Sequence, residues 1–238
     1  LGAIDATSVL WHWVAPVLAG AFLAATGGLL IWDLEHPARF YLIFTRPQWK
    51  SWLVRGAVII GGYSLVLAGH FAATVMGAER VHGMLMIPGG VLALLTAVYT
   101  AYLFAQAKAR DLWQNPLLPA HFAVQAVLAG AAALVPLAAW LEPAGVSPLL
   151  WTLGGTAALH VLLVAGEVTL THATAHARLA TVEMVRGKFW PFFWAGVVLV
   201  AGAGFAPWIG LAAAPIALLG LLAHEHAYVQ AGQAVPLA

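Results

Sequence analysis

The chain has 238 residues, of which 63% are hydrophobic and 8% are charged, and its net charge is +1. A water-soluble domain carries about 25% charged residues, so charge here is too scarce to cover a soluble surface. The near-neutral balance gives no reason to expect a nucleic acid partner. The absence of cysteine excludes disulfides, thiolate-ligated iron–sulfur clusters and cysteine-ligated zinc from this chain.

Apolar segments of bilayer length recur along the whole sequence. A spanning helix needs about 20 mostly apolar residues, and lipid offers no partner for open backbone, so helices are expected throughout. We predict an all-α, polytopic transmembrane helix bundle that forms one domain over residues 1–238. The seven predicted spans, the last two joined by almost no loop, are 10–32, 54–76, 84–107, 119–141, 148–170, 189–207 and 209–230. The first span lacks a preceding basic segment and is too long for a signal peptide.

The basic residues are strongly asymmetric across these spans. Three loops (33–53, 108–118 and 171–188) and the C-terminus fall on one side. That side holds nine of the ten basic residues: Arg39, Arg46, Lys50, Arg55, Lys108, Arg110, Arg178, Arg186 and Lys188. By the positive-inside rule this side is cytoplasmic and residue 1 starts outside. The alternative is that some of these cations dock an acidic partner subunit instead.

Ionisable residues lie inside the predicted spans. Glu167 is within span 148–170, where a charge is costly enough that function is the default hypothesis. His160 lies two turns earlier on the same helix face, and His172 follows toward the basic side. Imidazole exchanges protons near neutral pH, so these residues predict a proton path, with His70 in the outer third of span 54–76 as its far end. The alternative is a structural hydrogen bond between helices.

The span directions place several polar residues at one inner depth. A quinone needs donors for its carbonyls and apolar walls for its ring and tail, which such a ring of side chains under an apolar roof would provide. Each residue alone is more typical of the membrane interface. The ring comprises Asp33, Tyr99, His121, Glu167, His172 and the cluster His224, Glu225 and His226.

Two other classes of protein are compatible with these residues. A haem b-containing cytochrome b-type anchor needs two imidazoles at one depth on facing helices. At the inner side His121 could pair with His172 or His224, and at the outer side the candidates are His70, His12 and His82, but no pair stands out. A proton-coupled transporter would use Glu167 and His160 to bind its coupling proton, although no inverted repeat or pair of broken helices is evident.

Three motifs along the chain belong together. The first motif is Asp33–Phe40 with Phe44–Trp52 and Arg55-Gly56. The second runs from Tyr99–Leu103 through Ala109–Pro116. The third and weakest runs from Glu167 through Val185–Trp190, with Gln230–Pro236 at the end. Together these motifs cover nearly the whole chain, the first two are fairly specific, and they resemble the NrfD family, the polysulfide-reductase-type membrane subunit of quinone-linked oxidoreductases.

This resemblance implies a haem-free subunit with no metal of its own, which binds menaquinone or ubiquinone. It implies a ferredoxin-like iron–sulfur partner and a catalytic subunit of the molybdopterin type, which would carry the terminal substrate chemistry. The family's quinone-contacting tyrosine matches Tyr99. We expect His121 as a second donor, and Asp33 as a companion by depth. The partner-docking residues are expected to be Arg39, Arg46, Lys50, Arg110 and Trp113.

Two features depart from the family pattern. Family members have eight or more helices, and span 10–32 looks like their second, so we expect an eight-helix plan that lacks its first helix. The basic, partner-facing side is the second departure, because the corresponding face of the polysulfide enzyme looks out of the cell. If the positive-inside rule holds, the protein lies in a prokaryotic cytoplasmic membrane with its partners on the cytoplasmic side.

Overall fold

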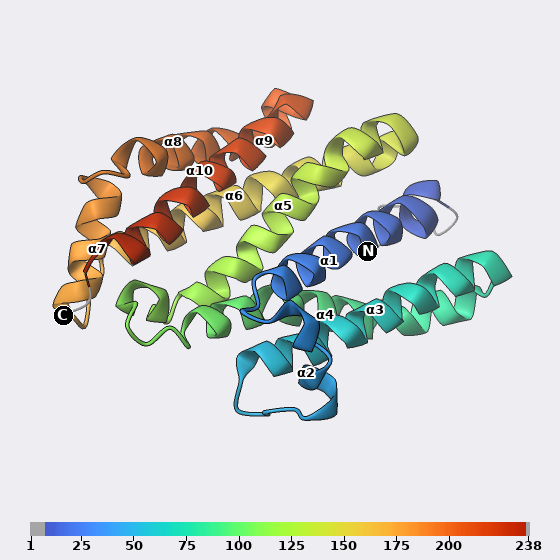
Figure 1. Cartoon of the computed structure of the whole chain (residues 1–238). Helices are drawn as coiled ribbons and strands as arrows, with labels where there is room; N and C mark the ends of the chain where they lie inside the picture. The colour runs from blue at the N-terminus through green and yellow to red at the C-terminus, as the bar shows by residue number, and fades with distance from the viewer. Residues whose placement is uncertain (1–7, 237–238) are drawn as a thin grey trace. The chain divides into compact units, whose positions relative to one another are not determined.

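A computed structural model describes residues 8–236 of the chain, and most of this stretch is helical (Figure 1). Within these residues there is no β-strand. Six helices are long and apolar enough to cross a membrane, or up to seven if one bent pair of helices counts as a span. The prediction of an all-α polytopic bundle is therefore confirmed. The chain divides into two compact units, Leu1–Leu103 and Phe104–Ala238.

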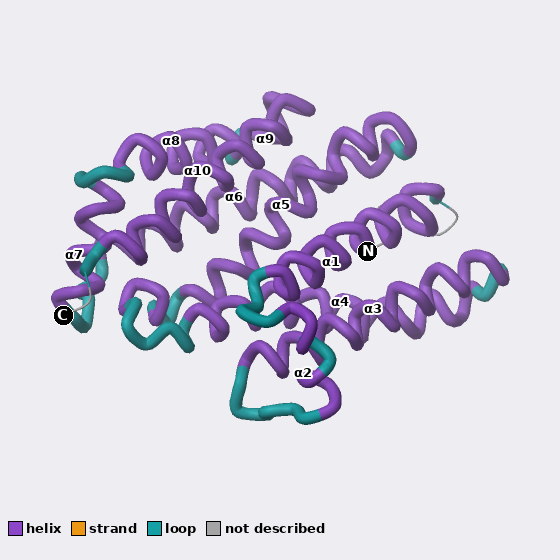
Figure 2. Tube along the Cα trace, viewed as in Figure 1, coloured by secondary structure: helices purple, strands orange, loops and turns teal. Residues whose placement is uncertain are grey.

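The first unit contains three long membrane helices and short helical turns between them. In chain order its elements are η1 (Leu10–Val14, a π-helix), α1 (Ala15–Trp32), η2 (Pro37–Arg39), α2 (Leu42–Thr45), α3 (Trp52–Met76) and α4 (Glu79–Phe104). Irregular segments flank the short α2 (Figure 2). The turn between α3 and α4 depends on Gly77, whose φ of 64° is favoured only for glycine.

Helices α3 and α4 contact each other through large side chains of one helix that reach glycines of the other. A Cβ at Gly69 would lie 3.1 Å from Leu85 Cδ1, and one at Gly62 would lie 3.6 Å from Leu92 Cδ2. At the far end of the same pair, Trp52 stacks on Tyr102 with ring centroids 4.3 Å apart. Small residues at helix contacts are how membrane helices achieve dispersion contact without a hydrophobic driving force.

The second unit holds the larger packed core. Its elements are η3 (Asp111–Gln114), α5 (Leu118–Leu141), η4 (Pro143–Gly145), α6 (Val146–Thr169), α7 (Ala175–Val185), α8 (Trp190–Ala203), α9 (Ala206–Ile209), η5 (Gly210–Ala212) and α10 (Ala213–Ala234). Alanine dominates the core, with Ala132, Ala157, Ala203 and Ala217 each almost fully buried. These small side chains let α5, α6, α8 and α10 approach one another closely.

The structure differs from the predicted spans around residues 171–207. The predicted loop 171–188 contains the helix α7 (Ala175–Val185). Thr174 caps its N-terminus, because the Thr174 hydroxyl accepts a hydrogen bond from the Ala177 N–H. One face of α7 is buried, with the i, i+3, i+4, i+7 spacing of an amphipathic helix. Its buried residues are Ala177, Ala180, Thr181 and Met184. The sixth predicted span is shorter than expected, because α8 has only 14 residues and qualifies as a span only together with α7, to which it is bent by 73°.

Helix α8 approaches α10 closely where Gly196 faces the α10 backbone. A Cβ at Gly196 would lie 2.8 Å from the backbone nitrogen of His224 and 3.0 Å from the Gly220 carbonyl oxygen, so Gly196→Ala must separate the two helices. We expect a loss of about 1–3 kcal/mol of stability, measured by thermal unfolding in detergent. Gly202→Ala on the same helix is the control, because its Cβ would meet only Ile216 Cγ2 at 4.0 Å. Equal stability of the two variants would contradict the prediction.

Candidate functional site

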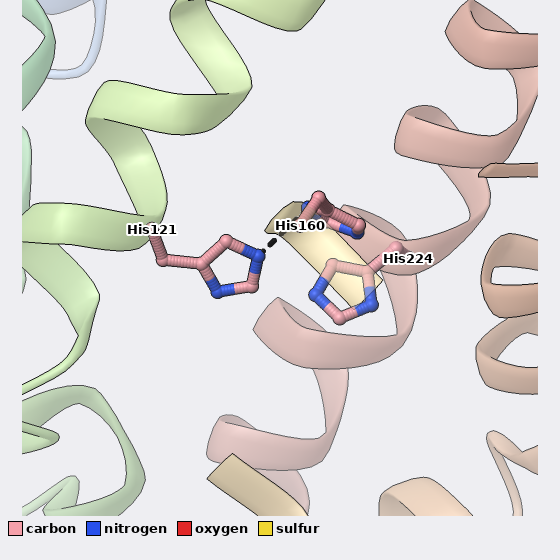
Figure 3. Close-up of side chains that lie close together, drawn as sticks. All are labelled: His121, His160 and His224. Atoms are coloured by element: carbon pink, nitrogen blue, oxygen red, sulfur yellow. Dashed lines mark hydrogen bonds between the residues drawn. The ribbon is translucent and has the colours of Figure 1, made fainter. Parts of the chain in front are cut away.

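Three histidines from three helices meet inside the second unit (Figure 3). His121 lies on α5, His160 on α6 and His224 on α10, and each is at most 1% exposed. The ring centroids of His121 and His160 are 4.6 Å apart, and that of His224 lies 4.9 Å from the His160 ring and 5.4 Å from the His121 ring. Burying three imidazoles among apolar helices costs desolvation free energy that alanine or leucine would not, so this cluster is the first candidate site.

His121 links this cluster to the buried carboxylate of Glu167. Its Nδ1 lies 2.9 Å from Glu167 Oε1, and its Nε2 lies 2.8 Å from His160 Nδ1. When Glu167 is ionised, His121 Nδ1–H donates to it, and His121 Nε2 is free to accept from His160 Nδ1–H. Protonation of His121 reverses the second bond, so that His121 donates to His160. The three side chains therefore form a continuous hydrogen-bonded row that can accept or release one proton without separating.

The order of the row follows from helix geometry. His160 and Glu167 are seven residues apart on α6, so both lie on one face of that helix, two turns apart. His121 on α5 reaches into the gap between them, since each of its ring nitrogens faces one of the two. The neighbouring helix α10 is held close at His224 by the contact with Gly196. Two helices, α5 and α6, thus complete the row, and α10 adds His224 beside it.

A second carboxylate, that of Glu225 from the predicted polar ring, lies beside the cluster. Glu225 Oε1 accepts a hydrogen bond from Gln125 Nε2, and the same amide nitrogen lies 3.5 Å from His121 Nε2. Both Gln125 and Glu225 are partly exposed, unlike the histidines. The sequence signal was the pair His224-Glu225 at the depth of His121, but only the packing of α5 against α10 shows that Gln125 joins them.

Some polar atoms of the cluster have no hydrogen-bond partner among residues 8–236. They are His160 Nε2, His224 Nδ1 and Glu167 Oε2. One nitrogen from each of His121, His160 and His224 lies within 4.8 Å of the others, which is close enough for a single cation to contact all three. His121 Nε2 already faces His160 Nδ1 at hydrogen-bond distance. The expectation that this chain holds no metal stays a prediction.

The other predicted quinone residues lie in the first unit. Tyr99, on α4, is 2% exposed and packs its ring on Gly56 of α3. Asp33 is exposed at the C-terminal end of α1. The structure thus encloses the phenol of Tyr99 between two helices and leaves the Asp33 carboxylate accessible.

His70 belongs to a separate histidine group at the other end of the α3–α4 pair. His70 Nδ1 lies 3.1 Å from His82 Nδ1, and His82 Nε2 lies 3.2 Å from the Thr74 hydroxyl. The ring of His12, from the π-helix η1, lies 4.5 Å from that of His82. His12, His70 and His82 are all buried. The partner of His70 is thus His82, which the sequence suggested only as a haem candidate.

The predicted docking residues divide into two kinds. Arg39, Arg46 and Lys50 are exposed in the segment between α1 and α3. Arg110 and Trp113 make contacts within the second unit instead. Arg110 Nη1 donates to the carbonyl oxygens of Gln233 and Val235 at 3.0 and 3.1 Å.

Trp113 and His172 are likewise engaged inside the second unit. Trp113 is buried, stacks on Phe104 and covers Gly232, where a Cβ would lie 2.7 Å from its Cε2. His172 precedes α7, and its Nε2 lies 3.0 Å from the hydroxyl of Thr181 within that helix. The contacts of Arg110 and Trp113 hold the loop before α5 against the end of α10.

Comparison with protein families identifies one match that spans nearly the whole chain. The family model described as polysulphide reductase, NrfD, matches residues 11–234. No curated protein and no solved structure is significantly similar to this chain.

Proposed function

The chain belongs to the NrfD family of polysulphide reductase membrane proteins, and we propose that it is a haem-free subunit of a respiratory oxidoreductase complex that exchanges electrons between an iron–sulfur partner and membrane quinone. The family match over residues 11–234 is the observation that carries this proposal. The long apolar helices make the chain a multi-pass membrane protein. It therefore lies in the lipid phase in which quinone is dissolved.

The quinone, menaquinone or ubiquinone, is proposed to bind near Tyr99, with His121 and Asp33 as further contacts. A phenol donates a hydrogen bond to a quinone carbonyl, and the apolar surface of α3 and α4 suits the ring and tail. His121 Nε2 now lies against His160 Nδ1, so a quinone carbonyl at His121 would compete with that bond. Tyr99 is therefore proposed as the main hydrogen-bond donor to the quinone.

Protons for the quinone are proposed to pass through the row of Glu167, His121 and His160. Reduction of a quinone to a quinol consumes two electrons and two protons. The electrons would come from the partner's cluster, and the protons would pass along the hydrogen bonds of this row. The geometry favours such a role because each bond of the row is 2.8–2.9 Å long. His172 and His70 are proposed as outlying members toward the two membrane faces, with His82 as the immediate neighbour of His70.

The partner subunits are proposed to dock on the basic side of the membrane. Arg39, Arg46 and Lys50 are exposed there and can pair with acidic residues of a ferredoxin-like subunit. Arg110 and Trp113 would shape the docking face by holding their loop in place. The positive-inside rule makes this side cytoplasmic in a prokaryotic inner membrane, with a molybdopterin-type catalytic subunit attached through the iron–sulfur protein.

Purification of the chain from its native membrane, with a tag at the C-terminus, tests this proposal. We expect an iron–sulfur protein to co-purify, quinone to be extractable, and the spectrum of the isolated subunit to lack a Soret band. A Soret band would support the cytochrome b-type alternative. A preparation that contains this chain alone, as monomer or homo-oligomer, would favour a proton-coupled transporter. Metal analysis of the isolated subunit checks the expectation that His121, His160 and His224 hold no metal.

A further inference from the structure

Tyr99 is held by a contact that leaves no space on one side of its ring. A Cβ built on Gly56 would lie 2.5 Å from Tyr99 Cδ2 and 2.9 Å from Cζ. Real Cβ atoms essentially never approach another heavy atom closer than 3.0 Å. The phenol ring therefore lies directly on the backbone of α3, in a place that any residue other than glycine would fill.

At the other glycines of α3 that face α4, the neighbouring side chain is farther away or is a flexible leucine. At Gly62 a Cβ would meet Leu92 at 3.6 Å, which is an ordinary van der Waals distance, and at Gly69 it would meet the flexible end of Leu85. Gly56 is thus the position in this helix pair where an aromatic ring, and not an aliphatic side chain, depends on the glycine. A phenol ring cannot move one end aside as the branched end of a leucine does, because its planar ring turns as one rigid body about χ1 and χ2.

The layer one turn away from Gly56 and Tyr99 is also packed by aromatic rings. Trp52, one turn before Gly56, stacks on Tyr102, one turn after Tyr99, at an interplanar angle of 13°. The Arg55 guanidinium lies 4.7 Å from the centre of the Trp52 ring, and Arg55 Nε donates to the Trp49 carbonyl oxygen at 2.8 Å. This arrangement fixes both helices one turn away from Tyr99.

We propose that Gly56 is a positioning residue for Tyr99: the absence of a side chain at Gly56 seats the phenol ring and so sets where its hydroxyl points in the quinone site. This inference rests on the proposed function, which makes Tyr99 a donor to quinone. A methyl group at Gly56 would displace the ring, and the hydroxyl at the far end of the ring would move with it. A displacement of about 1 Å at a reacting group can cost up to about 10²-fold in rate.

The test is a set of variants in the complete complex, assayed for turnover with a soluble quinol. We expect Gly56→Ala to lower kcat/KM for quinol by about tenfold or more. Gly62→Ala is the matched control on the same helix and facing the same partner helix, and it should leave kcat/KM unchanged. If Gly56→Ala behaves like Gly62→Ala, the inference is wrong.

A double-mutant cycle separates positioning from a general packing defect. In a Tyr99→Phe background the hydroxyl is absent, so adding Gly56→Ala should cost little more activity. An additive loss in the double variant would assign Gly56 a packing role and overturn the proposal. If Tyr99→Phe by itself leaves quinol kinetics unchanged, Tyr99 is not a hydrogen-bond donor to the quinone. The positioning role of Gly56 is then wrong as well.

A second double variant tests the proposal if the complex that carries Gly56→Ala does not assemble. The double variant Gly56→Ala/Tyr99→Ala removes the ring that the new methyl group would meet. Recovery of the assembled complex, measured by size-exclusion chromatography in detergent, would show that the conflict is with the Tyr99 ring, as proposed. Continued failure to assemble would show that Gly56 is needed for backbone approach alone and would overturn the inference.

Discussion

Replacing Glu167 by Gln is expected to slow quinone turnover by about 10²-fold, the lower end of what a positioned proton donor or acceptor contributes. The amide has nearly the shape of the carboxyl group, and its oxygen can still accept from His121 Nδ1–H, so the complex should assemble. It cannot take up a proton, however, and the row from Glu167 through His121 to His160 would lose its carboxylate end. Steady-state quinol oxidation or quinone reduction by the purified complex measures the effect.

Glu35→Gln is the matched control, because it makes the same chemical change at an exposed carboxylate. It should leave turnover close to that of the unmodified complex. Unchanged turnover in Glu167→Gln, in a complex of normal composition, would remove Glu167 from the proton path. Glu225→Gln would then be the next variant to examine, since Glu225 is the other carboxylate linked to this cluster through Gln125.

Replacing His121 by Leu is expected to destabilise the second unit by about 3 kcal/mol or more, because it leaves the buried carboxyl group of Glu167 without its partner. Glu167 is 5% exposed, and its Oε1 lies 2.9 Å from His121 Nδ1. Its other oxygen has no hydrogen-bond partner in the described part of the chain. The loss should appear as a lower midpoint of thermal unfolding in detergent.

The double variant His121→Leu/Glu167→Leu shows whether the unpaired carboxyl group is the cause. Removing both partners replaces a polar pair by apolar side chains of similar size, which is often nearly neutral for stability. We therefore expect the double variant to unfold at a higher temperature than His121→Leu alone, although it should be inactive with quinone. A double variant less stable than His121→Leu would mean that Glu167 contributes to the fold by some other contact.

The sequence by itself determined that this is an all-α membrane protein, because runs of about 20 apolar residues have few other stable solutions. It also located Glu167 and His160 on one helix face, since helical periodicity is a local property. The motifs around Asp33, Tyr99 and Trp113 led to the NrfD family, and the match over residues 11–234 confirms that resemblance.

Only the tertiary structure decided which polar residues meet. His121 is 39 residues from His160 and 46 from Glu167 in sequence, yet it lies between them. His70 pairs with His82, across the turn at Gly77. Such partnerships depend on the rotation and offset of packed helices. Small residues such as Gly56 and Gly196 set how closely a neighbouring ring or helix can approach, and shifts of a few tenths of an ångström matter there. Hydrophobic periodicity gives the face of a helix but not the residue opposite it. The packing of the helices therefore decided which residues form the candidate site, while the sequence alone predicted the spans that carry them.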